Sequence, residues 1–139
     1  MLKHRILIVE DDASVIRNLQ ILLMSDYEVI EASDGQTGHQ IAQIAEPDLI
    51  IMDIVMPRMN GIELCNALKV VPHLQFVPII VITGYATPEL EERLKKVGVE
   101  VILKKPFEMS ELMEQINKLL YHVPATEKRV PIHEIQGFH

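Results

Sequence analysis

The sequence has little of what several protein classes need. A single cysteine, Cys65, excludes an intramolecular disulfide, and no histidine lies close enough to it in sequence to suggest a metal pair. No apolar run reaches the roughly 18–20 residues of a membrane span, and the amino-terminal stretch "MLKHRILIVEDD" turns acidic before a signal-peptide core forms. These absences predict a soluble cytoplasmic protein without a membrane partner, in which Cys65 is a small residue packed on a helix.

Positive charge is also scarce. Thirteen lysines and arginines stand against twenty aspartates and glutamates, so the formal net charge is −7. A chain of this sign repels phosphate-rich partners, which argues against direct nucleic-acid binding. With 139 residues, of which 48% are hydrophobic, the chain can bury one core, and we expect a single compact domain.

The abundant apolar residues form a repeating strand and helix pattern. Short apolar runs predict strands over residues 5–9, 27–32, 49–52, 77–83 and 99–104. Apolar residues at helical spacing predict helices that begin near residues 14, 35, 61, 88 and 110. Strands such as "LIIM" and "IIVI" are apolar on both faces, which is typical of a parallel sheet covered by helices on both sides. The alternation therefore predicts an α/β fold of the doubly wound class.

The repeating pattern ends after Tyr121. Residues 122–139 contain two prolines, mixed charge and no sustained period. We therefore predict a domain over residues 1–121 and a C-terminal tail, or the start of an interdomain linker, over residues 122–139.

Polar side chains stand at the carboxyl ends of four predicted strands. They are Glu10, Asp11 and Asp12 after the first strand, Asp53 after the third, Thr83 at the end of the fourth, and Lys104 and Lys105 at the end of the fifth. Ligands of an open α/β sheet collect outside these ends, so the groups are expected to meet. Carboxylates from two strands would repel each other unless a hard divalent cation lay between them, and Mg²⁺ commonly takes one or two carboxylates, a carbonyl and waters. The pattern predicts an acidic pocket that holds Mg²⁺.

Asp53 lies within the apolar stretch "IIMDIVMP", residues 50–57. A strand of this kind holds the carboxylate rigidly at the mouth of the metal site, where an oxygen can act as a nucleophile toward a phosphoryl group. Thr83 can hydrogen-bond the phosphoryl oxygens, and Lys105 can offset their charge. Each residue alone has a simpler explanation, as a helix cap, a strand-end carboxylate, a loop hydroxyl or a solvated charge. Their coincidence at four strand ends favours one joint site.

These landmarks occur in a definite order along the chain. The stretches "ILIVEDD", "MDIVMPRMNG", "ITG" with the following Tyr85 and Ala86, and "KKPF" lie on successive predicted strands. Together they resemble a two-component response-regulator receiver domain, a chemotaxis-regulator-like phosphoacceptor domain, over residues 4 to about 121. The resemblance implies a flavodoxin-like (βα)5 sandwich with a five-stranded parallel sheet in the order 2-1-3-4-5.

The resemblance also implies a role for each polar residue. Asp53 corresponds to the phosphoacceptor, which takes a phosphoryl group from the phosphohistidine of a sensor histidine kinase or phosphotransfer protein. Thr83 matches the switch hydroxyl and Lys105 the phosphate-contacting lysine, whereas Asp12 and Lys104 are expected to take no direct part. The Mg²⁺ ion, for which Mn²⁺ can substitute, would be bound by Asp11, Asp53, the backbone carbonyl of Val55 and, through water, Glu10.

In the family that this sequence resembles, phosphorylation changes a surface that corresponds here to residues 88–96, 99–104 and 110–120. That surface controls an effector domain or partner protein and can form a homodimer. The aromatic residue of the family's switch normally stands three positions before the lysine, where this chain has Ile102. Ring rotation therefore cannot operate here, and Ile102 is expected to pack in one state instead.

Tyr85 stands two residues after Thr83, at a position where the family tunes the access of water to the phosphoryl group. A bulky ring at this position is expected to slow hydrolysis. The resemblance implies a regulatory domain rather than an enzyme, since it catalyses only its own phosphorylation and dephosphorylation.

Other functions fit parts of the pattern. A Mg²⁺-dependent aspartyl-phosphate phosphatase would share Asp53 but typically needs a second carboxylate two residues later, where this chain has Val55. A flavin- or nucleotide-binding module would need glycine-rich or hydroxyl-rich loops after the first strand, where this chain has three acids. A phosphorylation-independent protein interaction domain on the same fold is the other alternative.

Overall fold

The computed structural model describes residues 2–56, 59–126 and 129–136. Within these residues, five parallel strands form one sheet, namely β1 (Arg5–Val9), β2 (Glu28–Ala32), β3 (Leu49–Asp53), β4 (Ile79–Thr83) and β5 (Val101–Lys104). The helices are α1 (Ala13–Leu23), α2 (Gly35–Ala45), α3 (Gly61–Lys69), α4 (Pro88–Lys96), α5 (Met109–Leu120) and α6 (Ile132–Gln136). The strands lie in the order β2-β1-β3-β4-β5, which confirms the predicted topology. No helix in this part of the chain is both long enough and apolar enough to span a membrane.

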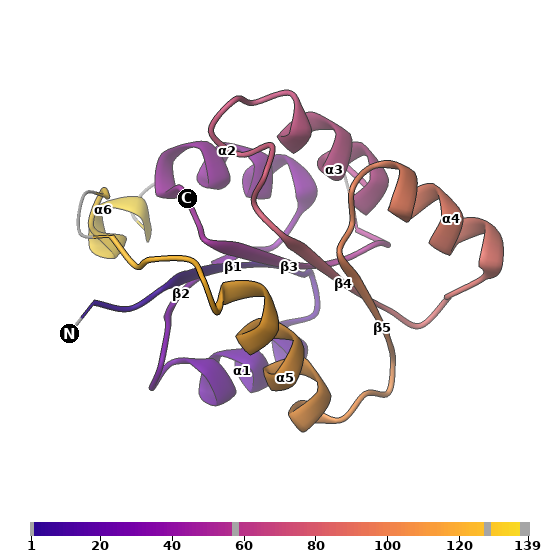
Figure 1. The fold of residues 1–139 in the computed structure, drawn as a ribbon, viewed down its shortest axis with the longest axis horizontal. Coiled ribbons are helices and arrows are strands. Elements are labelled where there is room, and N and C mark those ends of the chain that lie inside the picture. Colours follow the sequence, from indigo (N-terminus) through magenta and orange to yellow (C-terminus); the bar gives the residue numbers. More distant parts are fainter. Residues whose placement is uncertain (1, 57–58, 127–128, 137–139) are drawn as a thin grey trace.

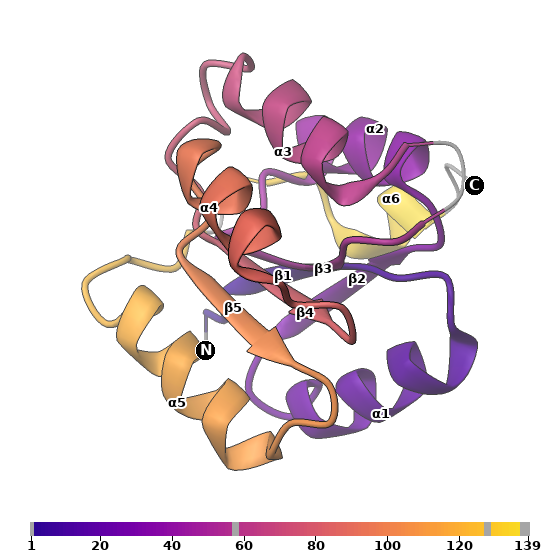
Figure 2. The ribbon, with the colours of Figure 1, turned by 90° about the vertical axis from the view of Figure 1, so that its right-hand side faces the viewer.

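Helices cover both faces of the sheet (Figures 1 and 2). Helices α1 and α5 lie on one face, and α2, α3 and α4 lie on the other. Successive side chains of a strand point to opposite faces, so each central strand contributes to two cores. In β1, Leu7 and Val9 belong to the core under α2 and α3, whereas Ile6 and Ile8 belong to the core under α1 and α5. This double burial explains why β1 is a continuous apolar run in the sequence.

Polar side chains fix where three helices begin. The Asp34 carboxylate accepts a hydrogen bond from the Thr37 amide at the start of α2. Asn60 and Glu63 cap α3 reciprocally, each side chain accepting from the backbone amide of the other. The Thr87 hydroxyl oxygen caps α4. These caps satisfy amides that have no partner within the helix, and they set the length of the loop that follows each strand.

Two strands begin two residues later than their apolar runs indicated. Val77 and Val99 were predicted to be the first residues of strands, but β4 and β5 each begin two residues beyond them. The Val77 amide donates to the Leu74 carbonyl at 3.1 Å, and the Val99 amide donates to the Leu94 carbonyl at 3.0 Å. These amides are used in turns and helix ends before the sheet begins.

The residues after α5 fold back onto the domain. They include helix α6, which the sequence pattern did not predict. Ile135 in α6 is only 1% exposed and belongs to the core under α2. Helix α6 contacts α2 and β2, at the β2 edge of the sheet (Figure 1).

Candidate functional site

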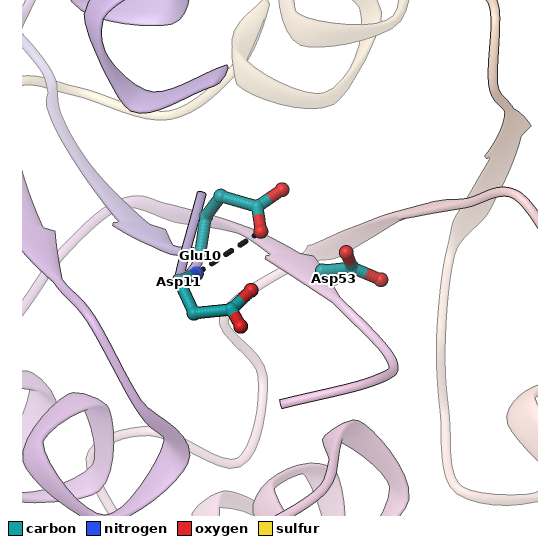
Figure 3. A group of neighbouring side chains, drawn as sticks. All are labelled: Glu10, Asp11 and Asp53. Carbon is teal, nitrogen blue, oxygen red and sulfur yellow. Dashed lines mark hydrogen bonds between the residues drawn. The ribbon is translucent and has the colours of Figure 1, made fainter. Parts of the chain in front are cut away.

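Three carboxylates meet at the carboxyl ends of neighbouring strands (Figure 3). Glu10 and Asp11 directly follow β1, and Asp53 is the last residue of β3, which pairs with β1. A carboxylate oxygen of each residue lies within 4.8 Å of one from each of the others. The structure thus brings together the three acidic side chains that the sequence pattern assigned to a metal site.

Glu10 is the most buried of the three acids. Its Oε2 accepts hydrogen bonds from the backbone amides of Asp11 at 3.0 Å and Asp12 at 3.3 Å, which hold the side chain in place. Burial raises the pKa of the Glu10 carboxyl, and the negative charge of Asp53 raises it further, against the lowering effect of the hydrogen bonds. Glu10 therefore gains more from a nearby cation than an exposed glutamate would.

Lys105 follows β5 and reaches back to two of these carboxylates. Its Nζ lies 3.2 Å from Glu10 Oε1 and 3.1 Å from Asp53 Oδ2. Partial burial lowers the pKa of Lys105, but the hydrogen bonds and negative charges of Asp53 and Glu10 outweigh this effect and raise the pKa overall. The Lys105 amide also donates to the Thr83 carbonyl at 2.8 Å, and the following peptide bond to Pro106 is cis. The amine is therefore a fixed positive charge beside Asp53.

The Asp53 carboxylate is held by the loop that follows it. Its Oδ1 accepts a hydrogen bond from the Val55 amide at 3.2 Å. The Val55 side chain itself is exposed, so the contact to Asp53 comes from the backbone. Residues 57–58 of the "MDIVMPRMNG" stretch lie outside the described residues. The loop orients the carboxylate while leaving its second oxygen to Lys105.

Gly61, which ends the same stretch, was not among the predicted site residues. Its amide donates to the Ile54 carbonyl at 2.8 Å, which closes the loop after Asp53 onto the start of α3. A Cβ at Gly61 would lie 2.8 Å from the Ile54 Cα and 3.0 Å from the Asp53 carbonyl oxygen. Backbone atoms cannot yield as a flexible side chain would, so glycine is required for this close approach. The glycine is visible in the sequence, but its contact with the Asp53 backbone is not.

Thr83 ends β4 at the same edge of the sheet and is buried. Asp53 lies opposite Ile82 in the sheet register, one residue before Thr83. The Thr83 Oγ1 accepts a hydrogen bond from the Tyr85 amide at 3.1 Å. The Tyr85 residue is 74% exposed, so its ring lies at the surface in this conformation.

Ile102 lies in β5 opposite Val81 of β4 and is half-buried. It packs against the core under α2, α3 and α4. A hollow of about 200 Å³ is lined by Glu91, Lys95, Val99, Glu100 and Ile102. The aliphatic side chain at this position therefore borders open space between α4 and β5.

Two neighbouring charged residues have other partners. Asp12 caps α1, since its Oδ1 accepts from the Ser14 hydroxyl at 2.7 Å and the Ser14 amide at 2.9 Å, and these bonds lower the pKa of Asp12. Lys104 Nζ lies 3.9 Å from Glu91 Oε1 of α4. In this structure both side chains therefore bond to residues outside the acidic cleft.

The donor set fits a hard divalent cation. Carboxylate oxygens are ligands that Mg²⁺ prefers, and Mg²⁺ usually keeps several waters. Asp11 is exposed, so water can complete a coordination shell on its side. Asp11 and Asp53 can provide direct ligands, with Glu10 behind them and the Val55 backbone beside Asp53. Lys105 offsets part of the remaining negative charge.

Similarity to known proteins extends over most of the chain. The sequence pattern of the response regulator receiver domain matches residues 6–117. The transcriptional regulatory protein PdtaR of Mycobacterium tuberculosis is 38% identical over 115 residues, which cover 81% of this chain and 55% of PdtaR. The chain thus spans about half the length of this curated relative.

Solved structures show the same architecture. The chemotaxis protein CheY4 of Vibrio cholerae has a TM-score of 0.81 and 33% identity, covering 85% of this chain and 99% of its own. The receiver domain of the sensor histidine kinase PA1611 from Pseudomonas aeruginosa, with a magnesium ion coordinated in its active site cleft, has a TM-score of 0.79 and 27% identity. That match covers 86% of this chain and 98% of the other. With its strand order, its acidic cleft and these similarities, the chain belongs to the response regulator receiver domain family of two-component systems.

Proposed function

We propose that this chain is a phosphorylation-controlled switch in which Asp53 accepts a phosphoryl group, with Mg²⁺ or Mn²⁺ bound at the acidic cleft. The donor is the phosphohistidine of a sensor histidine kinase or of a phosphotransfer protein, and the reaction takes place in the cytoplasm. The observation that carries the proposal is the meeting of Glu10, Asp11 and Asp53 within 4.8 Å, with the Lys105 ammonium against two of them. The magnesium ion in the similar PA1611 domain supports it.

The transfer requires positioning and charge rather than an acid and base pair. An oxygen of Asp53 forms a bond to phosphorus while the P–N bond of the phosphohistidine breaks. The electron pair of that bond stays on the imidazole nitrogen, which takes up a proton from solvent. A bound Mg²⁺ supplies positive charge for the phosphoryl oxygens. The Val55 amide fixes the direction in which Asp53 presents its oxygens.

Lys105 and Thr83 are proposed to respond to the new group. Lys105 Nζ lies 3.1 Å from Asp53 Oδ2, so a phosphoryl group on Asp53 comes within its reach and offers it more negative charge. The Thr83 hydroxyl, which accepts from the Tyr85 amide here, would instead donate to a phosphoryl oxygen. This movement would shift the chain that leads from Thr83 into α4. The exposed Tyr85 ring would then limit the access of water to the phosphoryl group and slow its hydrolysis.

The output surface in this proposal is formed by α4, β5 and α5. It would contact an effector domain or a partner protein, and it can form a homodimer. Ile102 lies within this surface and lines the hollow of about 200 Å³ between α4 and β5. Because isoleucine has no ring to rotate, we propose that α4 shifts over Ile102 and that the hollow changes shape on phosphorylation.

Intact mass spectrometry after incubation with phosphoramidate tests the proposal. The wild-type chain is expected to gain one phosphoryl group only with Mg²⁺, and hydroxylamine is expected to remove it because acyl phosphates react with it. Asp53→Asn is expected to gain none. Asp12→Asn is the matched control, because Asp12 is an acid in the same region that caps α1, and asparagine caps equally well. It should be modified like the wild type.

Other results would favour the alternatives. A stable adduct on Asp53→Asn would contradict the assignment of the acceptor. Failure of the wild type with phosphoramidate and also with a panel of phosphorylated histidine kinases would favour a phosphorylation-independent interaction domain. Continuous turnover of phosphomonoesters would favour a phosphatase, although the exposed Val55 provides no carboxylate at the position such enzymes use.

A further inference from the structure

The residues after α5 cross the sheet at the end opposite the acidic cleft. We call the described residues 122–126 and 129–136 the C-terminal strap. In Figure 1 the strap leads from α5 past the amino-terminal side of the sheet to α6. The His4 Nε2 and the Val123 carbonyl oxygen form a hydrogen bond just before β1. The strap therefore joins the C-terminal part of the chain to the starts of the central strands.

An ion pair fastens the strap to the base of β3. Arg129 Nη1 donates to Asp48 Oδ2 at 2.8 Å, and its Nη2 donates to Asp48 Oδ1. Both side chains are almost fully buried, at 7% and 6% exposure. Asp48 Oδ2 also accepts from the Arg5 amide at 2.8 Å, so Asp48 links the strap to β1. A bidentate ion pair of this kind fixes the relative orientation of the two side chains and also pairs their charges.

One apolar side chain anchors the far end of the strap. Ile135 is buried against the core under α2, and Val130 and Ile132 are only partly buried beside it. Helix α6 contacts α2 and β2. Within the described residues, β2 has a strand neighbour on one side only, so α6 covers part of an edge strand. Exposed strand edges can pair with other chains, which makes such a cover useful.

The interface between the strap and the rest of the domain contains a cavity. A cavity of about 490 Å³ is lined on the domain side by the segments before β3 and β4 and on the strap side by Val123, Thr126 and Arg129. About half of the described strap residues are exposed, and Ile135 is the one among them that is buried as a whole residue, so the segment depends on few buried contacts. The ion pair adds little net stability, because both charges regain water when the strap opens.

We propose that the C-terminal strap is a releasable cover of the β2 edge. It opens as a unit while the five-stranded domain stays folded, and the Arg129–Asp48 ion pair holds it in the closed position. Removing one partner of this ion pair weakens the closed state, since the other charge then stays buried without its counter-ion. Opening involves the end of β3 that lies away from Asp53, so this inference does not depend on phosphorylation.

Thiol labelling of the 139-residue chain tests the strap and the core in the same molecule. Ile135→Cys places a thiol in the anchor, and the buried Cys65 reports on opening of the core. The thiol at position 135 is expected to react at least tenfold faster with iodoacetamide under native conditions than Cys65 does. Adding Arg129→Gln is expected to speed the reaction at position 135 by about tenfold and to leave Cys65 unchanged. Arg17→Gln, in an exposed position on α1, is the matched control and should change neither rate.

Three results would overturn the proposal. The first is equal labelling of both thiols with the same dependence on urea, because the strap would then unfold only with the domain. The second is a strap thiol that does not respond to Arg129→Gln. The third is hydrogen exchange at the amides of residues 129–136 that is no faster than at the amides of β1, β3 and β4. This measurement uses the native sequence, so any opening of the strap by Ile135→Cys itself does not affect it.

Discussion

Cys65 shows how burial controls the chemistry of one residue. It lies on α3 with no exposed surface, and its Sγ is 3.7 Å from the Met52 Sδ. Burial raises the pKa of the Cys65 thiol to about 11. The sequence pattern predicted a packed helix residue, and the structure confirms it. The thiol is therefore a reporter of core opening rather than a reactive group.

Alkylation of Cys65 should be slow in the folded protein. Since the ordinary pKa is 9.0, a pKa of about 11 leaves about 100-fold less thiolate at pH 8, and burial slows the reaction further. The rate of iodoacetamide labelling, followed by mass spectrometry at pH 8, should be at least 100-fold lower than in urea-unfolded protein. The unfolded chain loses this proton first, so stability should also fall as pH rises above about 9. Equal labelling of native and unfolded protein would contradict the packing of α3.

The polar residues of the cleft were predictable because each ends an apolar strand. Parallel strands bring such ends to one edge, which is why Glu10, Asp11 and Asp53 could be placed together in advance. The bonds among side chains were not predictable. That Lys105 contacts both Glu10 and Asp53, and that the Thr83 hydroxyl accepts from an amide, depends on rotamers that tertiary packing selects.

At the scale of elements, the packing of α2 on β1 depends on a glycine. A Cβ at Gly38 would lie 2.9 Å and 3.0 Å from the two Cγ atoms of Val9, which is fully buried. Helix and sheet therefore approach more closely here than an alanine would allow. The same glycine lowers the intrinsic helix propensity of α2, so the tight contact outweighs the local preference.

Gly38→Ala should therefore destabilise the protein. At an exposed helix position this change stabilises by up to about 1 kcal/mol, but here we expect a loss of about 1–3 kcal/mol in the free energy of unfolding. Urea denaturation followed by circular dichroism measures the change. Gln40→Ala, on an exposed position of the same helix, should alter stability by about 0.5 kcal/mol or less. A gain in stability for Gly38→Ala would show that Val9 can move aside.

The existence and order of the central elements followed from periodicity, but their limits did not. The starts of β4 and β5 depend on which carbonyls take the amides of Val77 and Val99, and those partners belong to preceding turns and helices. Helix α6 has too few residues for a clear period. Arg129, which precedes this helix, bonds to Asp48, which lies far away in the sequence. The assignment of residues 122–139 to a linker stays a prediction.

At the scale of the whole molecule, a net negative charge is combined with an acidic cleft at one end of the sheet. The chain carries a formal charge of −7, and three of its acids share the cleft. In the absence of a metal ion, Lys105 is the cation that contacts Glu10 and Asp53 among the described residues. A divalent cation that binds only the folded state must stabilise it by mass action.

Mg²⁺ should therefore stabilise the protein, and more so without Lys105. At 100 times its dissociation constant, Mg²⁺ is expected to add about 2.7 kcal/mol to the free energy of unfolding. Lys105→Met is expected to cost about 1 kcal/mol without Mg²⁺, because Glu10 and Asp53 then repel each other, and to increase the gain from Mg²⁺. Thermal unfolding with and without Mg²⁺ measures both effects. Lys118→Met, on an exposed position of α5, is the control; an equal effect of NaCl at the same ionic strength would contradict specific binding.

The length of strand β3 separates the Arg129–Asp48 ion pair from the acidic cleft at Asp53. Asp48 stands just before the strand and Asp53 ends it, and a strand rises about 3.3 Å per residue, so roughly 16–17 Å of backbone lies between them. His133 is exposed on the strap. An immobilisation tag or fluorescent dye attached there would leave the acidic cleft open to a bulky protein donor. The molecule could thus be tethered to a surface and its phosphorylation followed one molecule at a time.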